Sequence, residues 1–430
     1  MDILTTIAFG VIFFALIMVS VALHELGHML PAKRFGVRVP QYMVGFGPTL
    51  WSTTRGETEY GIKGFPLGGY VRLLGMYPPG SKREGRPSRV GEMAEAAREQ
   101  EWSQITPTDV ADNRLFYQKR TWQKLVVMFG GPFMNILIAF LLFWGITGWY
   151  GVPRAQTTIA YVQQCVIPAD AQRTTCEPGD PPTPAARAGL QAGDRVVEFN
   201  GVEISSYEQL SGLIRANLDG EARIVVLRDG TAVDLPVVHT MISGVRDNWD
   251  PSRLIPAGWL GVSPEQVLTT GGPLEVLSDM ATMTGQSLVA LVQFPVKVWN
   301  VVADMVTGRP RDVYGPISIL GASQVAGQVI AQEGLPWQTK AVTFASLLAS
   351  INLFLAVFNL VPLPPLDGGH MLGAVWEWLR RRGARLLRRP DPGPFDTARL
   401  LPIAYGVAAL LLLSGVVLIL ADIISPLQLF

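Results

Sequence analysis

The chain has 430 residues, of which 35 are Lys or Arg and 35 are Asp or Glu, so its formal net charge is zero. That balance excludes a nucleic-acid-binding protein that works through bulk positive charge. Charged residues make up only 16% of the chain and hydrophobic residues 49%, and the mean hydropathy is +0.28. These values exclude a disordered chain and argue against an ordinary soluble enzyme.

Apolar runs of membrane-spanning length occur four times. Each is free of charged side chains and has about the 20 residues that a bilayer requires. They are residues 3–23, 125–150, 341–361 and 400–421. A further run, residues 281–296, is too short to span comfortably and contains Gln286 and Gln293, so we expect an amphipathic or partly embedded helix there.

Basic clusters predict the direction of these spans, because short cytoplasmic loops carry an excess of Lys and Arg. The clusters follow the first span, precede the second and follow the third: Lys33, Arg34 and Arg38; Lys119, Arg120 and Lys124; and Arg380, Arg381, Arg382, Arg385, Arg388 and Arg389. The pattern places both termini and residues 151–340 outside the cytoplasm.

Two further regions have soluble character. Residues 41–77 are rich in glycine and aromatic residues and predict a β-hairpin or small sheet, whereas residues 78–113 are polar and predict a solvated loop with a helical piece. Residues 151–240 carry short β-like runs with turn signals at Asn200-Gly201 and Asp229-Gly230. Cys165 and Cys176 both fall in this exterior region, where a disulfide is favoured over two buried free thiols.

The segment His24-Glu25-Leu26-Gly27-His28 is an H-E-x-x-H motif. On a helix, positions i and i+4 share one face, so both imidazoles can reach one metal ion while the glutamate serves as a base. Catalytic zinc takes a third protein ligand. Position 34 is Arg, which excludes the metzincin pattern. The remaining candidates are Glu57, Glu59, His370 and, favoured because the third span carries it to the same membrane depth, Asp367.

Several motifs together resemble known families. Residues 188–201 resemble the A-G-L-x-x-G-D…N-G signature of bacterial PDZ domains, which bind a peptide as an added strand. The H-E-x-x-H motif, residues 359–368 (N-L-V-P-L-P-P-L-D-G) and the intervening PDZ-like segment resemble the site-2 protease family. Within it, two segments resemble the regulator of sigma-E protease group: Gly130-Gly131-Pro132-Phe133-Met134-Asn135 and Tyr314-Gly315-Pro316-Ile317-Ser318-Ile319.

That resemblance implies an intramembrane zinc endopeptidase. One Zn²⁺ ion per chain would be held by His24, His28 and Asp367, with Glu25 as general base. Asn359 would bind the substrate backbone or the oxyanion. An edge of the hairpin would hold the unwound substrate, which implicates Gly64, Phe65, Gly68 and Gly69.

The expected substrate is a single-pass membrane protein, in particular an anti-sigma factor already trimmed outside. The expected location is a bacterial cell (inner) membrane, with the PDZ domain and both termini extracytoplasmic. A trimmed substrate end or another peptide is expected at the PDZ domain, and no nucleic acid. Two alternatives are a catalytically silent membrane PDZ scaffold and a zinc transporter, which would need ligands spread along a path.

The expected fold class is a polytopic α-helical membrane protein with an inserted extracytoplasmic PDZ domain and a cytoplasmic-side β-hairpin region. The expected organisation is four transmembrane helices (1–32 with the H-E-x-x-H motif, 125–150, 341–379 and 400–421), a cytoplasmic-side region (33–124), the PDZ domain (151–260), a juxtamembrane helical region (261–340), a basic cytoplasmic loop (380–399) and an extracytoplasmic tail (422–430).

Overall fold

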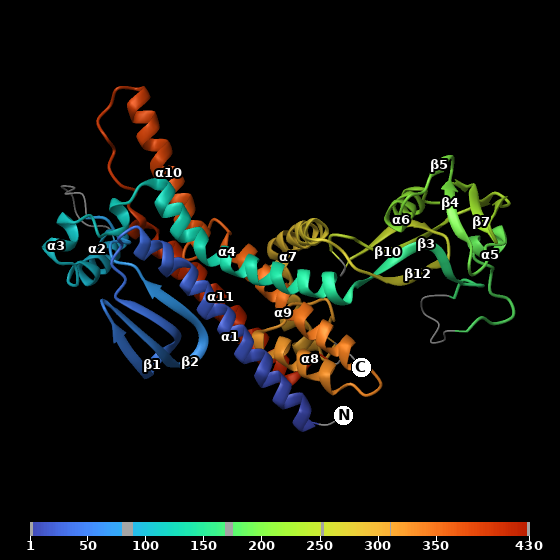
Figure 1. Ribbon diagram of the computed structural model, residues 1–430, viewed down its shortest axis with the longest axis horizontal. Coiled ribbons are helices and arrows are strands. Elements are labelled where there is room, and N and C mark those ends of the chain that lie inside the picture. The colour runs from blue at the N-terminus through green and yellow to red at the C-terminus, as the bar shows by residue number, and fades with distance from the viewer. Residues whose placement is uncertain (1–2, 80–88, 168–174, 251–252, 310, 428–430) are drawn as a thin grey trace. The chain divides into compact units, whose positions relative to one another are not determined.

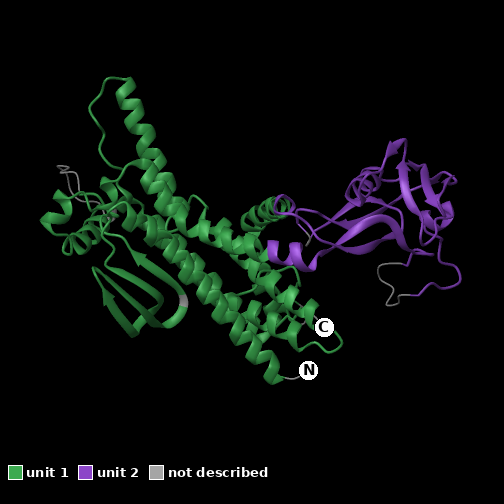
Figure 2. Cartoon of the chain, in the orientation of Figure 1, with its two compact units in different colours: residues 1–143, 276–430 green, residues 144–275 purple. Residues whose placement is uncertain are grey.

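The computed structural model describes residues 3–79, 89–167, 175–250, 253–309 and 311–427. Parts of the predicted polar loop, of the cysteine-containing loop and of the C-terminal tail therefore lie outside the described residues. The chain forms two compact units, one of residues 1–143 with 276–430 and the other of residues 144–275 (Figure 2).

The first unit is mainly helical (Figure 1). Its elements in chain order are α1 (Ile3–Arg34), β1 (Gln41–Arg55), β2 (Thr58–Arg72), α2 (Arg89–Trp102), α3 (Pro107–Ala111), η1 (Phe116–Gln118), α4 (Thr121–Gly145), α7 (Pro273–Thr307), α8 (Ile319–Ala331), α9 (Trp337–Asn359), α10 (Asp367–Leu386), η3 (Thr397–Leu400) and α11 (Leu401–Ile424).

Within the described residues, five helical segments are long and apolar enough to cross a membrane. Three of them contain the predicted spans 3–23, 125–150 and 400–421, and α9 covers the predicted span 341–361 up to Asn359. The fifth is α7, so the predicted count of four was incomplete. Hydropathy falls at Gln286, Gln293 and Pro295, which made residues 281–296 look isolated, yet the helix continues on both sides of that run for 35 residues in all.

The two ends of α7 pack against different helices of the bundle. Near its start, Val276 and Met280 contact a cluster that contains Ala139 of α4. Near its end, Val301 packs with Leu418 and Ala421 of α11. The helix between these contacts rises by ~38 Å along its own axis.

The two ends of α7 nevertheless contact the bundle near the same end of it, because α8 packs against the adjoining parts of α4 and α11. Leu142 of α4 packs in one cluster with Phe13 of α1 and Ala322 of α8. A Cβ on the neighbouring Gly321 would touch Asp422 of α11. In Figure 1, α7 is foreshortened where α1 is seen along its length. Its length and hydropathy permit a span, while its packing is that of a helix inclined across the bundle.

Strands β1 and β2 both bend, so each contributes two segments to one small sheet. Residues 41–44 of β1 pair on one side with residues 69–72 of β2 and on the other with residues 59–62. The second half of β1 pairs with the first half of β2, from Trp51↔Ile62 to Arg55↔Thr58. Residues 69–72 therefore form one edge of the sheet and the second half of β1 the other.

The polar segment after this sheet is less solvated than predicted, since α2 packs on the bundle. The buried carboxylate of Glu101 accepts hydrogen bonds from the backbone N–H groups of Gly75, Met76 and Tyr77 at 2.8, 2.8 and 2.9 Å. Arg98 is paired with Asp396 at 2.7 Å. Through these two side chains, α2 connects the residues just after β2 to the segment that precedes α11.

The second unit is a β-domain whose core is fully buried. Its elements are η2 (Ile146–Tyr150), β3 (Val152–Val162), α5 (Pro184–Ala188), β4 (Arg195–Phe199), β5 (Val202–Glu203), α6 (Tyr207–Ala216), β6 (Glu221–Ala222), β7 (Ile224–Arg228), β8 (Thr231–Asp234), β9 (Val238–His239), β10 (Met241–Arg246), β11 (Leu254–Trp259) and β12 (Val262–Thr269). The main sheet has the order β12-β3-β4-β7-β8 with β5 beside β4.

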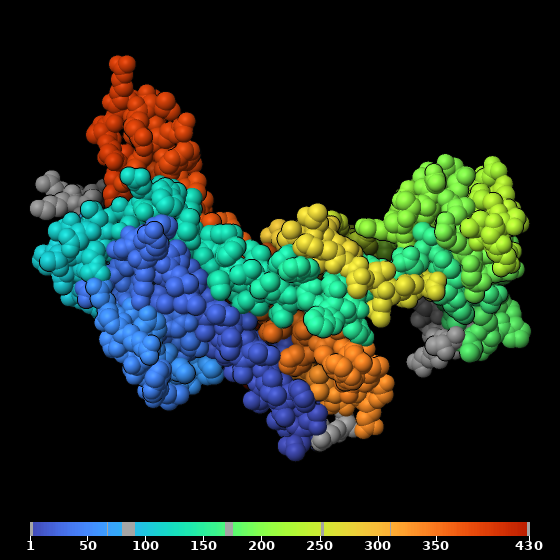
Figure 3. Space-filling model, in the orientation of Figure 1, coloured from blue at the N-terminus to red at the C-terminus, as the bar shows by residue number. Residues whose placement is uncertain are grey.

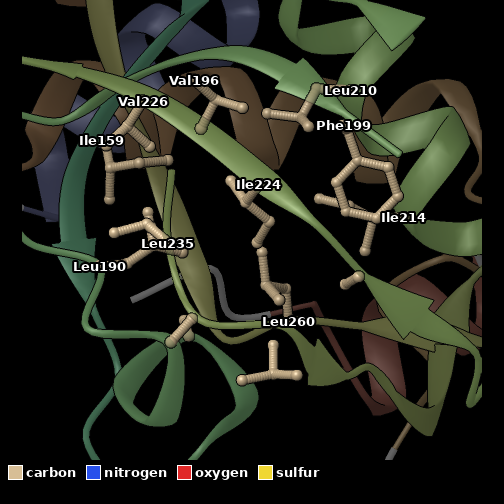
Figure 4. Close-up of a cluster of buried hydrophobic side chains, with 14 of the residues drawn as sticks. Ile159, Leu190, Val196, Phe199, Leu210, Ile214, Ile224, Val226, Leu235 and Leu260 are labelled. Carbon is tan, nitrogen blue, oxygen red and sulfur yellow. The ribbon is translucent and has the colours of Figure 1, made fainter. Parts of the chain in front are cut away.

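Inward-facing residues of these strands build the core of that domain (Figure 4). Val196 and Phe199 of β4 and Ile224 and Val226 of β7 are at most 2% exposed and pack together with Leu210 of α6. The predicted turns are present, because Asn200 and Asp229 adopt positive φ and each precedes a glycine that does the same.

The predicted bond between Cys165 and Cys176 is present. Cys165 is buried, so the bond anchors one end of its loop to the domain.

Candidate metal centre

Two imidazoles and one carboxylate converge at the end of α1. His24 and His28 are four residues apart on the helix, and their Nε2 atoms lie 3.2 Å apart. The Oδ2 atom of Asp367, the first residue of α10, lies 3.4 Å from Nε2 of His24 and 3.3 Å from Nε2 of His28. Among the described residues, this is the group of three whose ligand atoms all fall within 4.8 Å of one another.

Asp367 reaches this position because the chain breaks between α9 and α10. Pro362, Pro364 and Pro365 cannot continue α9, so residues 360–366 form irregular backbone before α10 begins. Irregular backbone at membrane depth survives where it lines a cavity or is covered by protein. The following Gly368 is packed so closely that a Cβ would clash with the carbonyl oxygens of Leu360 and Val361.

Glycines on α4 make room for the imidazoles, a feature that the sequence analysis did not identify. Gly130 of α4 lies directly against Gly27 of α1, so any Cβ on either would clash with the other backbone. A Cβ on Gly131 would clash with the rings of His24 and His28. The sequence signal that could have revealed this close packing is the Gly130-Gly131 pair, which belongs to the segment that resembles the regulator of sigma-E protease group.

The three converging atoms fit a bound cation. The Nδ1 atom of His28 lies 2.8 Å from the carbonyl oxygen of Val127, so Nδ1 carries the proton and the lone pair on Nε2 faces His24 and Asp367. Oδ2 of Asp367 is buried and has no hydrogen-bond partner. Two imidazole nitrogens and a carboxylate oxygen form a donor set that zinc commonly uses.

Polar side chains and a strand edge surround the three ligands in a cavity of about 300 Å³. Glu25 and Asn359 both line it, as does the loop at Leu366. The sheet contributes Gly69, Tyr70 and Val71, three residues of its edge segment. The remaining lining residues are His24, His28, Leu73, Met76, Met128, Pro365, Asp367 and His370.

The four predicted substrate-contacting residues of the hairpin are not all at this cavity. Gly69 lines it and lies against Glu25, since a Cβ on Gly69 would be 3.1 Å from Cγ of Glu25. Gly64, Phe65 and Gly68 are absent from its wall, and Phe65 is 58% exposed and packs at Gly47 near the bend of β1. The bend of the strands carries these three residues away from the metal ligands.

The other candidate ligands have different surroundings. Glu57 is paired with Arg114, and Glu59 accepts a hydrogen bond from the side-chain amide of Gln41 at 3.0 Å. His370 lines the cavity, but it does not belong to the three-residue cluster.

Comparisons with known proteins agree with this arrangement. The sequence model of peptidase family M50 matches residues 12–387. The chain is 35% identical over 442 residues to zinc metalloprotease Rip1 of Mycobacterium tuberculosis and 36% identical over 437 residues to that of Mycolicibacterium smegmatis, with 98% of both chains covered in each case. It is 27% identical to zinc metalloprotease RasP of Oceanobacillus iheyensis, covering 88% of this chain and 91% of the relative.

Replacing Asp367 with Asn should lower the zinc content of the purified full-length protein from about one ion per chain to a small fraction, because one ionised ligand is lost. The measurement is elemental analysis after dialysis. Glu59→Gln and His370→Asn are the matched controls and should keep their zinc. Loss of zinc from either control, with retention in Asp367→Asn, would assign the third ligand differently.

Proposed function

Because the chain belongs to peptidase family M50, the site-2 protease family of zinc metalloproteases, we propose that it hydrolyses a peptide bond of a single-pass membrane protein within the bilayer. The observation that carries the proposal is the joint position of Glu25, the three ligand side chains and a strand edge around one cavity. The substrate that we propose is an anti-sigma factor already shortened outside the membrane, as the motifs of the regulator of sigma-E group suggest.

The three metal ligands, Glu25 and Asn359 each have a role in this reaction. When bound at His24, His28 and Asp367, zinc supplies a Lewis acid that polarises the scissile carbonyl and acidifies water. The Glu25 carboxylate takes a proton from the attacking water and delivers it to the leaving amine. The amide NH2 of Asn359 donates a hydrogen bond to the substrate backbone or to the developing oxyanion.

The edge of the small sheet is suited to hold the substrate in extended form. A helical substrate must unwind first, because its backbone amides are otherwise committed to internal hydrogen bonds. Residues 69–72 pair with β1 on one side only, and three of them line the cavity. We propose that the unwound segment adds to this edge as a further strand, beside Glu25.

Charge supports a bacterial cell-membrane orientation with the metal centre toward the cytoplasm. Lys33 and Arg34 end α1, and the arginines of α10 follow the metal ligand Asp367. Basic residues concentrate on the cytoplasmic side of membrane proteins. The second unit and both termini would then be extracytoplasmic, where the disulfide between Cys165 and Cys176 is favoured.

We further propose that the second unit is a PDZ domain that docks or filters substrates. Its support is the sequence signature in residues 188–201, which spans the turn before β4, β4 itself and the Asn200-Gly201 turn. The domain would take the end of a trimmed substrate along a sheet edge.

The alternative functions fit the site less well. A catalytically silent scaffold has no need of Glu25 beside a complete ligand set. A zinc transporter needs ligands along a path, whereas in the described part of the chain the ligand atoms form one cluster.

The Glu25→Gln variant should retain zinc and lose cleavage of a model single-pass substrate by about 10²–10⁴-fold, because the general base is removed while the ligands remain. The assay uses full-length protein in proteoliposomes, with zinc content measured on the same samples. Asp367→Asn is the comparison and should lose both zinc and cleavage. Undiminished cleavage by zinc-loaded Glu25→Gln would refute the role of Glu25.

Substrate addition at the edge predicts a position-dependent crosslink. In the Glu25→Gln background, a cysteine at Tyr70 should form a disulfide with a cysteine placed near the scissile bond of the substrate. A cysteine at Ser52, on the opposite edge of the same sheet, should not. Equal crosslinking at both edges, measured by gel electrophoresis without reductant, would contradict the proposal.

A further inference from the structure

A cavity away from the metal centre lies between the start of α4 and the second half of α10. Its volume is about 580 Å³, and its wall contains Arg120, Arg381 and Arg385 together with Trp122 and Trp378. Figure 3 shows the cyan start of α4 adjoining the red atoms of α10. A second cavity of about 260 Å³ extends it along α10 and shares Trp378 and Arg385.

The charge that this cavity presents is positive. Among the described residues that line its wall, none is acidic. Two carboxylates pair with the wall residue Arg381: Glu377 at 3.1 Å, which is 3% exposed and also binds Lys124 at 2.9 Å, and Asp391 at 3.3 Å. Arg120 and Arg385 are exposed and have no ion-pair partner among the described residues. Both guanidinium groups are therefore available to an anion.

The residues around the cavity are of the types expected where a bilayer changes from hydrocarbon to headgroups. Lys124 is the last charged residue before the apolar run of α4. The indole rings of Trp122 and Trp378 are 53% and 41% exposed, as expected of side chains that anchor a protein at this level. Arg382 stacks over the ring of Trp378 at 5.3 Å. Basic pockets at this depth recognise lipid phosphates.

An apolar stripe leads from the cavity along α4. Trp122, Val126, Phe129 and Phe133 are spaced by three or four residues, so they share one face of the helix, and each is between 37% and 53% exposed. A soluble anion or an acidic peptide would leave this stripe uncovered. A phospholipid would place its phosphate at the arginines and its acyl chains along the stripe.

We propose that the cavity between α4 and α10 binds an anionic glycerophospholipid, with its phosphate held by Arg120 and Arg385 and its acyl chains along Val126, Phe129 and Phe133. The site is separate from the cavity of the metal centre, with which it shares no lining residue. Because α10 begins at Asp367, the bound lipid would contact the same helix that supplies a metal ligand.

The test is native mass spectrometry of the detergent-solubilised full-length protein titrated with phosphatidylglycerol or with phosphatidylcholine of the same acyl chains. Wild-type protein should retain phosphatidylglycerol about tenfold better, and the Arg120→Gln/Arg385→Gln variant should lose that preference. The matched control, Arg388→Gln/Arg389→Gln, removes two charges of the same basic run that line neither cavity and should keep it.

Three results would overturn the proposal. They are no headgroup preference in wild-type protein, an unchanged preference in Arg120→Gln/Arg385→Gln, and an equal loss in the control, which would indicate bulk charge alone. Displacement of phosphatidylglycerol by inorganic phosphate would instead indicate a site for soluble anions. Because both arginines are exposed, folding should be preserved, and each single variant provides an independent partial loss if the double variant elutes as an aggregate.

Discussion

The structure depends on the convergence of three buried electron-pair donors at the end of α1. The imidazoles of His24 and His28 and the carboxylate of Asp367 approach one another within 3.2 to 3.4 Å, and Oδ2 of Asp367 has no hydrogen-bond donor. Without a cation, such a group would cost free energy, because buried polar atoms need partners. With a zinc ion bound to all three donors, the same group would hold α1 and α10 together.

Much of the surrounding architecture serves that convergence. Gly27, Gly130 and Gly131 let α4 approach α1 closely enough to form a wall behind the imidazoles. The proline-rich break after α9 supplies the irregular backbone from which Asp367 projects. The free edge of the β1–β2 sheet lines the same cavity as Glu25 and the three candidate ligands, which is the arrangement that the proposed reaction needs.

The candidate ligands could be predicted because helical spacing and the direction of the spans can both be inferred from sequence without the tertiary structure. Helical spacing placed His24 and His28 on one face, and charge asymmetry brought Asp367 to their level. The disulfide and the turns of the second unit followed from equally local signals. The number of spans could not be predicted from such signals, because Gln286, Gln293 and Pro295 lower the local hydropathy while leaving a 35-residue helix intact. The bend that separates Phe65 from Gly69 depends on long-range pairing of β1 with β2, which the hairpin pattern alone does not specify.

The central claim is that one zinc ion joins α1 to α10. The most direct measurement is an anomalous difference map at the zinc absorption edge from crystals of the zinc-loaded full-length chain. One peak is predicted, bonded at ~2.0–2.2 Å to Nε2 of His24, Nε2 of His28 and a carboxylate oxygen of Asp367. A peak bonded to the two imidazoles with Asp367 turned away, or a peak at other residues, would contradict the account.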